Sequence, residues 1–279
     1  MQNKSYSSSL AQKISEIVEF IQTKITYQPQ IGVILGSGLG EFVNVIKDKI
    51  IISYAEIPHL PPATAPSHAG NLIFGRIADK NVMVMQGRLH GYEGNTPQTN
   101  VLLVWAMKKL GVSSVVISCA AGGLNHKFNP GDIMVIDDQI NLTGNTPLTG
   151  PNLDEFGLRF PIMFDIYDKS LACLAHEIAS KHKVYLQRGV YVGVSGPQYS
   201  TRAELKYFID IGGGAIGMSV VHEAIAAAHS GLRILGLAAI TDLSLPYAVS
   251  HITEQEVIAN AQLIEIKFRD IVTDLIAEI

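Results

Sequence analysis

Short β-branched segments alternate with amphipathic segments along most of this chain. Residues 31–35, 113–119, 190–195 and 233–240 are apolar runs of the length expected for buried strands. Residues 8–25 instead place apolar side chains at the spacing of one helix face. Because helices between strands cover the faces of a sheet, this order predicts an α/β fold with a central, mostly parallel or mixed β-sheet.

Turn and capping residues mark further elements. Residues 72–76 and 82–85 flank Asp79-Lys80-Asn81, which predicts a hairpin. Helix boundaries are indicated by Thr96-Pro97 with Gly111, and by capping boxes at residues 201–204 and 253–256. No linker, repeat or low-complexity tract interrupts the sequence, so we expect a single domain over residues 1–279.

Composition excludes several classes of protein. The chain is 47% hydrophobic with a formal net charge of −4, so it has material for a large core and no basic surface for nucleic acid. Cys119 and Cys173 lie in apolar contexts without a CxxC motif, which indicates reduced thiols. The first residues lack a signal-peptide core, and no apolar run reaches the roughly 18 residues of a membrane span. We expect a cytoplasmic protein with no membrane partner.

Residues 87–93 (Gly-Arg-Leu-His-Gly-Tyr-Glu) carry the most unusual set of side chains. If the segment is extended, Arg88, His90 and Tyr92 point to the same side. Arginine offers a planar fork of donors to an oxyanion, and histidine adds a donor whose charge changes near neutral pH. The set suits an anion beside a hydroxylated ring, although a solvated strand edge is the simpler interpretation.

A glycine-rich loop, Gly-Ser-Gly-Leu-Gly, follows the first strand at residues 36–40. A dinucleotide fingerprint requires glycine at its sixth position, where this chain has Glu41, and the Gly-Lys-Ser/Thr of a Walker loop is missing. A loop for free phosphate, with the Ser37 hydroxyl as a donor, and an ordinary tight turn both fit the pattern.

Other candidates follow predicted strands or lie in loops. His68 could contribute to a site or be a surface residue, and the small residues 118–123 would let a ligand touch the backbone or let a helix pack closely. Tyr199 could stack on a flat ring, and Ser219 after Gly217-Met218 suits an anion at a helix start. Asp242 follows a very apolar strand, where poor solvation favours a protonated carboxyl; it could also be a turn or N-cap residue.

Two common kinds of catalytic site find no support in the sequence. The nine histidines show no HExxH motif and no paired spacing with cysteine, so we expect no metal site. No GxSxG elbow follows a strand, which argues against a serine hydrolase.

Taken together, these segments resemble the trimeric purine nucleoside phosphorylases and the related methylthioadenosine phosphorylases, from about Ile31 to the C-terminus. The resemblance implies one α/β domain around a mixed, partly barrel-like sheet flanked by helices, assembled as a homotrimer. The motifs that carry it are Gly-Ser-Gly-Leu-Gly (36–40), His-Ala-Gly (68–70), Gly-Arg-Leu-His-Gly-Tyr-Glu-Gly (87–94), Ala-Ala-Gly-Gly-Leu-Asn (120–125), Gly-Pro-Asn (150–152) with Phe-Gly-Leu-Arg-Phe (156–160), Gly-Pro-Gln-Tyr (196–199) and Gly-Met-Ser (217–219).

The resemblance also implies a role for each site residue, with His90 and Asp242 as the catalytic residues. The phosphate ligands would be Ser37, Arg88, His90, Ser219 and the backbone at Ala120, with His68 beside them. The ribose contacts would be Tyr92, Met218, His251 at the 5′-hydroxyl, and Phe160 reaching into a neighbouring subunit. The base contacts would be Tyr199 by stacking, with Ser200 and Asp242.

The implied reaction is phosphate-dependent cleavage of a purine (deoxy)ribonucleoside to free base and (deoxy)ribose 1-phosphate, in purine salvage. Phosphate is a co-substrate, and no cofactor or metal is implied. Catalysis would rest on positioning and electrostatics.

Two positions leave the preferred base open. The 6-oxopurine enzymes carry glutamate and asparagine where this chain has Ser200 and Asp242. Both resemble the methylthioadenosine branch, but that branch has a second aspartate where this chain has Ser244, and the position of His251 departs from the family spacing. A methylthioadenosine phosphorylase, a non-catalytic purine- or phosphate-binding paralogue, and a nucleotide-dependent oxidoreductase using residues 36–40 remain as alternatives.

Overall fold

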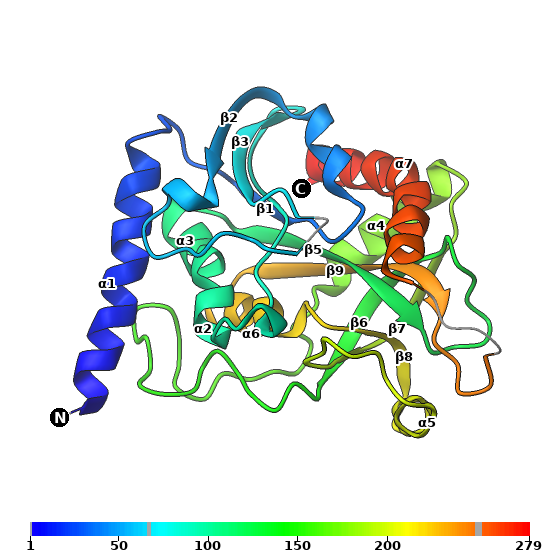
Figure 1. The fold of residues 1–279 in the computed structure, drawn as a ribbon. Coiled ribbons are helices and arrows are strands. Elements are labelled where there is room, and N and C mark those ends of the chain that lie inside the picture. The colour runs from blue at the N-terminus through cyan, green and yellow to red at the C-terminus, as the bar shows by residue number, and fades with distance from the viewer. Residues whose placement is uncertain (1, 66–67, 249–252) are drawn as a thin grey trace.

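The computed structural model describes residues 2–65, 68–248 and 253–279 (Figure 1). Within these residues, nine strands form one mixed sheet in the order β2-β3-β4-β1-β5-β8-β7-β6-β9. The strands are β1 (Ile31–Ile34), β2 (Lys47–Ser53), β3 (Asn71–Ile77), β4 (Lys80–Gln86), β5 (Ser114–Gly123), β6 (Ile133–Asn141), β7 (Leu186–Gly193), β8 (Gly213–Gly217) and β9 (Arg233–Leu243).

The sheet closes on itself at one end. β9 pairs with β6 and also in parallel with β5, so that β5, β8, β7, β6 and β9 form a closed ring of five strands. Beyond the ring, β1 lies parallel to both β5 and β4, and β2, β3 and β4 form an antiparallel meander. The predicted α/β class and the partly barrel-like sheet are both confirmed.

β5 changes its neighbour halfway along one edge. Residues 114–117 pair with β1, whereas Gly122 and Gly123 pair with β8. The opposite edge of β5 stays paired with β9 along its whole length. Residues 118–121 therefore face a gap in the sheet, and in α/β proteins ligands bind at such points beyond the carboxyl ends of strands.

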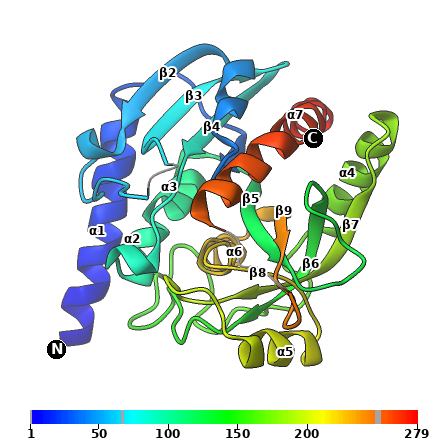
Figure 2. The same ribbon diagram turned by 45° about the vertical axis from the view of Figure 1, so that its right-hand side comes forward.

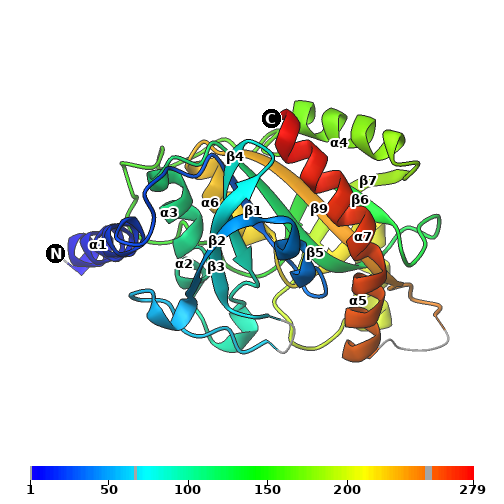
Figure 3. The same ribbon diagram turned by 90° about the horizontal axis from the view of Figure 1, so that it is seen from above.

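The helices lie in two layers on opposite faces of the sheet (Figures 2 and 3). One apolar cluster includes residues of α1 (Gln2–Gln22), α3 (Leu102–Leu110) and α6 (Val221–His229), and the other includes residues of α4 (Lys169–Lys181) and α7 (Glu254–Glu278). β4 is buried on both faces, because its alternate side chains enter opposite clusters, Met83 and Met85 in the first and Val82 and Val84 in the second. α5 (Arg202–Asp210) packs on the ring through Phe208.

The sequence-based boundaries agree with the structure in several places. β3 and β4 form the predicted hairpin, Gly111 ends α3 in the left-handed region at φ 104°, and both predicted capping boxes are present, at Thr201 and Thr253. β9 continues beyond the predicted end to Leu243, so Asp242 lies inside the strand rather than after it.

Other boundaries were wrong. The helix predicted from Thr96 to Gly111 is broken at Val101 into α2 (Pro97–Asn100) and α3. β7 covers Leu186–Gly193 and so begins earlier and ends earlier than predicted. β2 and β6 were not predicted. β2 is mostly exposed, and the buried apolar run of β6, residues 133–136, covers only the first half of the strand.

We expect Thr253→Ala to destabilise the start of α7. The Thr253 side chain accepts from the backbone N–H of Glu256, and Glu256 returns the contact to the backbone of Thr253. Losing an N-cap costs about 1 kcal/mol, which corresponds to roughly 2–4 °C in melting temperature. Fluorescence of the single tryptophan, Trp105, buried in α3, reports the transition. Thr253→Ser keeps the hydroxyl and should melt like the wild type; equal losses in both variants would contradict the capping role.

Candidate active site

A cavity of about 640 Å³ opens at the gap beside β5. This volume is within the range of small-molecule binding sites. Residues from widely separated segments line it, and ten of the residues predicted from the sequence are among them: Ser37, Arg88, His90, Tyr92, Ala120, Tyr199, Ser200, Met218, Ser219 and Asp242.

The glycine-rich loop crosses β5 at very short range. The backbone N–H of Gly36 donates to the Ser118 hydroxyl (3.3 Å), and a Cβ at Gly36 would lie 2.5 Å from the Cα of Cys119. Glycine is therefore required at position 36 for this close approach. The loop brings the Ser37 hydroxyl to 3.3 Å from Nε2 of His68.

Three rings stack along one wall of the site. The His68 and His90 ring centroids are 4.9 Å apart, and those of His90 and Tyr92 are 4.5 Å apart. The segment is extended only as far as His90, because Tyr92 lies in the short 3-10 helix Gly91–Glu93. The expectation of an extended segment through Tyr92 was thus wrong, although the side chains do converge.

Hydrogen bonds fix both histidines. His90 Nδ1 lies 3.1 Å from Glu93 Oε1, and within the described part of the chain no hydrogen bond engages Nε2. Burial disfavours the charge of Glu93, but hydrogen bonds from His90 and Thr64 outweigh it and lower the pKa of Glu93 to about 2. Burial, with the charge of His90, lowers the pKa of His68 to about 3, so His68 is neutral at pH 7.

Arg88 is the most deeply buried charged side chain of the site. It is 1% exposed, and one Nη2 hydrogen is donated to the Ser118 carbonyl at 2.7 Å, on the open edge of β5. Its Nε lies 2.9 Å from Oε1 of Glu223, a buried residue in the first turn of α6. The two form an ion pair, although the Nε–H is not aimed at a hydrogen-bond acceptor among the described residues.

Ser219 is held by a strained turn between β8 and α6. Val220 has φ 71° and ψ −56°, and the N–H of Val221 donates to the Ser219 carbonyl at 2.8 Å, which closes a γ-turn. A β-branched residue rarely adopts this conformation, and such strain concentrates at functional sites. α6 begins at Val221 without a side-chain cap, so Ser219 precedes the helix rather than opening it as expected.

The far end of the main cavity carries the predicted base residues. Tyr199 is half-exposed at the rim, and Asp242 lies in β9 opposite Gly122. Asp242 Oδ1 accepts from the Thr241 hydroxyl at 3.0 Å, and Oδ2 accepts from the Ser244 hydroxyl at 2.9 Å. Both carboxylate oxygens are therefore engaged by neighbouring hydroxyls.

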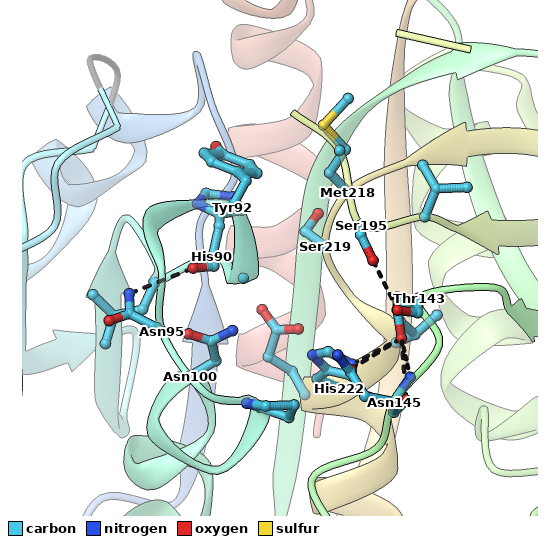
Figure 4. A pocket seen from close by; sticks show the side chains of 17 residues that line it. His90, Tyr92, Asn95, Asn100, Thr143, Asn145, Ser195, Met218, Ser219 and His222 are labelled. Atoms are coloured by element: carbon cyan, nitrogen blue, oxygen red, sulfur yellow. Dashed lines mark hydrogen bonds between the residues drawn. The ribbon is translucent and has the colours of Figure 1, made fainter. Parts of the chain in front are cut away.

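A smaller cavity of about 140 Å³ adjoins the first (Figure 4). His90 and Tyr92 lie on one side of it and Met218 and Ser219 on the other, and these four residues line both cavities. At its other end, His222 Nε2 lies 3.1 Å from the Thr143 hydroxyl. The two cavities thus meet where the stacked rings face Ser219.

The structure does not bring every predicted residue into the main cavity. His68, at the end of the ring stack, does not line the cavity and contacts Ser37 and the backbone of Arg88. Phe160 is 84% exposed in the segment between β6 and α4 and lines neither cavity. His251 lies outside the described residues.

Sequence reasoning missed two residues that contact predicted ones, Glu223 and Tyr191. Glu223 is the only carboxylate in α6, whose other residues are apolar apart from His222 and His229, and this was the available signal. The Tyr191 hydroxyl, buried in β7, accepts from the N–H of Ser219 at 3.4 Å. Nothing in the local sequence of β7 indicates that contact.

Among the described residues, no three His, Cys, Asp or Glu side chains gather as a metal site would require. Over the same residues, no helix combines the length and apolarity needed to cross a bilayer.

Comparison with known proteins identifies the family. A sequence model of the phosphorylase superfamily matches residues 30–277. Purine nucleoside phosphorylase 1 of Bacillus subtilis is 39% identical over 266 residues, covering 95% of this chain and 98% of the relative. The bovine purine nucleoside phosphorylase is 44% identical, covering 77% of this chain and 76% of its own length.

Solved structures agree with the sequence comparisons. Two crystal structures superpose with a TM-score of 0.91 at 35% identity, covering 96% of this chain and 97% of theirs: Schistosoma mansoni purine nucleoside phosphorylase with adenosine, and a schistosoma purine nucleoside phosphorylase with hypoxanthine. The resemblance inferred from the sequence motifs is confirmed, and the chain belongs to the purine nucleoside phosphorylase family of pentosyltransferases within the phosphorylase superfamily.

Proposed function

We propose that this protein cleaves purine nucleosides with inorganic phosphate, releasing the free base and (deoxy)ribose 1-phosphate in purine salvage. The observation that carries the proposal is the anion site: buried Arg88 reaches the cavity beside Ser37, His90 and Ser219, which come from different strand ends. The relatives' names, and the purine ligands of the Schistosoma enzyme, support the same reaction class.

Phosphate would lie between the glycine-rich loop and the start of α6. Ser37, Arg88, His90 and Ser219 supply side-chain donors, and the backbone at Ala120 lies on the open edge of β5, two residues beyond the carbonyl that accepts from Arg88. His68 is neutral and holds Ser37 and the backbone of Arg88 in place. A dense set of fixed donors positions the anion without reorganisation during the reaction.

The nucleoside would extend from this anion toward Asp242. A phosphate oxygen attacks the anomeric carbon as the bond to the purine nitrogen breaks, and the bonding electrons leave with the base. Tyr92 and Met218 contact the ribose, and Tyr199 stacks on the purine. Asp242 lies at N7 of the base, and this nitrogen must be protonated or hydrogen-bonded for the purine to leave.

Phosphate is the co-substrate, and the proposed reaction involves no further cofactor. We place the enzyme in the cytoplasm as a homotrimer. His251 is proposed for the ribose 5′-hydroxyl, and Phe160 of the partner subunit for the outer wall of the ribose pocket.

The first test combines phosphate dependence with Arg88→Ala. The wild type should release base and ribose 1-phosphate only when phosphate is present, because phosphate is the nucleophile. Arg88→Ala should raise the KM for phosphate and lower kcat, since the guanidinium stabilises both the bound anion and the transition state. A panel of nucleosides assayed by base release, with and without phosphate, gives both results.

The control for that test is Arg76→Ala, which removes an exposed arginine paired with Asp48 and should leave both constants unchanged. Equal cleavage without phosphate would indicate a hydrolase. Purine binding without any base release would support a non-catalytic paralogue, and preference for a 5′-methylthio substrate would support the methylthioadenosine branch.

The second test concerns assembly. Leu158, Phe160, Ile162 and Phe164 are all largely exposed in one segment, and such an apolar surface marks an interface with another protein. In a homotrimer, Phe160→Ala should raise the nucleoside KM several-fold more than the phosphate KM, because only the ribose pocket loses a wall. Tyr185→Ala, another exposed aromatic residue, is the control. A monomer by light scattering, with full specific activity on dilution, would contradict this proposal.

The third test concerns the base. In the 6-oxopurine enzymes, a glutamate accepts a hydrogen bond from N1–H of the base. This chain has Ser200 at that position and so lacks the carboxylate acceptor, and the Asp242 carboxylate would repel O6 of a 6-oxopurine. The Asp242 side chain can instead accept a hydrogen bond from a 6-amino group. We therefore expect better use of adenosine than in ordinary trimeric relatives.

Asp242→Asn combined with Ser200→Glu should shift the preference toward inosine and guanosine. A mismatched hydrogen bond in such a site costs on the order of a thousandfold in kcat/KM. Relative kcat/KM for adenosine, inosine and guanosine is the measurement, with each single variant as a control. Strong wild-type preference for inosine or guanosine would show the argument from Asp242 to be wrong.

A further inference from the structure

We propose that Glu223 is a positioning residue, the resident counter-charge that keeps Arg88 in the anion site while phosphate is absent. The inference rests on the proposed function, because it takes Arg88 as the phosphate ligand. Glu223 has no role in that proposal, and no sequence motif pointed to it.

The burial of Arg88 requires a partner. A cation at 1% exposure is very costly unless it is paired, and the stacked His68 beside it is neutral. Glu223 is 4% exposed, and its Oε1 lies 2.9 Å from Nε of Arg88. The guanidinium also donates a hydrogen bond to the Ser118 carbonyl, which is uncharged. Among the described residues, Glu223 is the carboxylate that forms an ion pair with Arg88.

The fold delivers Glu223 and Ser219 as one unit. The strained γ-turn at Val220 separates Ser219, which faces the cavity, from α6, whose first turn carries Glu223. The positive end of the helix dipole also favours a carboxylate at this position. Anion ligand and counter-charge therefore come from one short segment, residues 219–223.

The pairing leaves donors available to a ligand. Of the five N–H groups of the guanidinium, one is donated to Ser118, and the Nε–H has no hydrogen-bond acceptor among the described residues despite the nearby carboxylate. Arg88 is thus neutralised but incompletely hydrogen-bonded, and phosphate can complete its bonds.

The arrangement has an electrostatic consequence. Glu223 stabilises the empty site, but its negative charge opposes any anion that binds to the same guanidinium. Glu223 therefore weakens phosphate binding relative to Arg88 alone while keeping the empty enzyme folded with Arg88 in place.

The test is Glu223→Gln, which keeps the side-chain shape and removes the charge. In phosphate-free buffer its melting temperature should fall by roughly 5–10 °C, because the arginine loses its counter-ion. Saturating phosphate should restore most of that loss, and the phosphate KM should fall about tenfold with the nucleoside KM unchanged.

The matched control is Glu204→Gln. Glu204 occupies the same third position of a helix, α5, where glutamine also completes a capping box, and it makes no contact with Arg88. It should alter neither the phosphate KM nor the gain in stability on adding phosphate. A Glu223→Gln loss that is equal with and without phosphate, or an unchanged or higher phosphate KM, would overturn the proposal.

A double-mutant cycle with Arg88→Met separates this inference from the function on which it rests. In phosphate-free buffer, the double variant should lose less stability than the sum of the two single variants, since neither charge is then left alone. Additive losses would overturn the pairing. Coupling in the cycle, together with no stabilisation of the wild type by phosphate, would support the pairing and overturn the phosphate site itself.

Discussion

The gap beside β5 is the constraint on which the site depends. β5 pairs with β1 over residues 114–117 and with β8 only at Gly122 and Gly123. Between these, its backbone groups on that edge have no neighbouring strand and are available to side chains and ligands. The Ser118 carbonyl accepts from Arg88 and the Ser118 hydroxyl accepts from Gly36, so the open edge itself holds two parts of the anion site.

Closure of the five-stranded ring creates this gap. β8 pairs with β5 only at Gly122 and Gly123, near the end of β5. On the other edge of β5, the ring is completed through β9, β6 and β7. The ring also brings the β8–α6 turn and the end of β9 to the same opening as the ends of β1 and β4. Ser219 and Asp242 thus reach one cavity with Ser37 and Arg88, although these four residues lie far apart in the chain.

Charge balance in the cavity differs from end to end. At the anion end, Arg88 is paired with Glu223, His68 is neutral and Glu93 is held as a carboxylate by His90 and Thr64. At the base end, Asp242 accepts hydrogen bonds from two hydroxyl groups, those of Thr241 and Ser244. The anion end is suited to bind phosphate at a guanidinium that already has a counter-charge. The base end is suited to recognise a polar ring through a small number of hydrogen bonds.

The sequence by itself determined the elements whose signals are local. Apolar runs marked β1, β5 and β9, capping boxes marked α5 and α7, and Gly111 marked the end of α3, because each depends on residues a few positions apart. The motifs also identified the family and ten residues that line the cavity. Only the tertiary structure decided the partner of Arg88, the ring closure and the turn that holds Ser219. These depend on pairing between distant segments: Glu223 meets Arg88 because two strand ends converge, and no spacing within either segment encodes that contact.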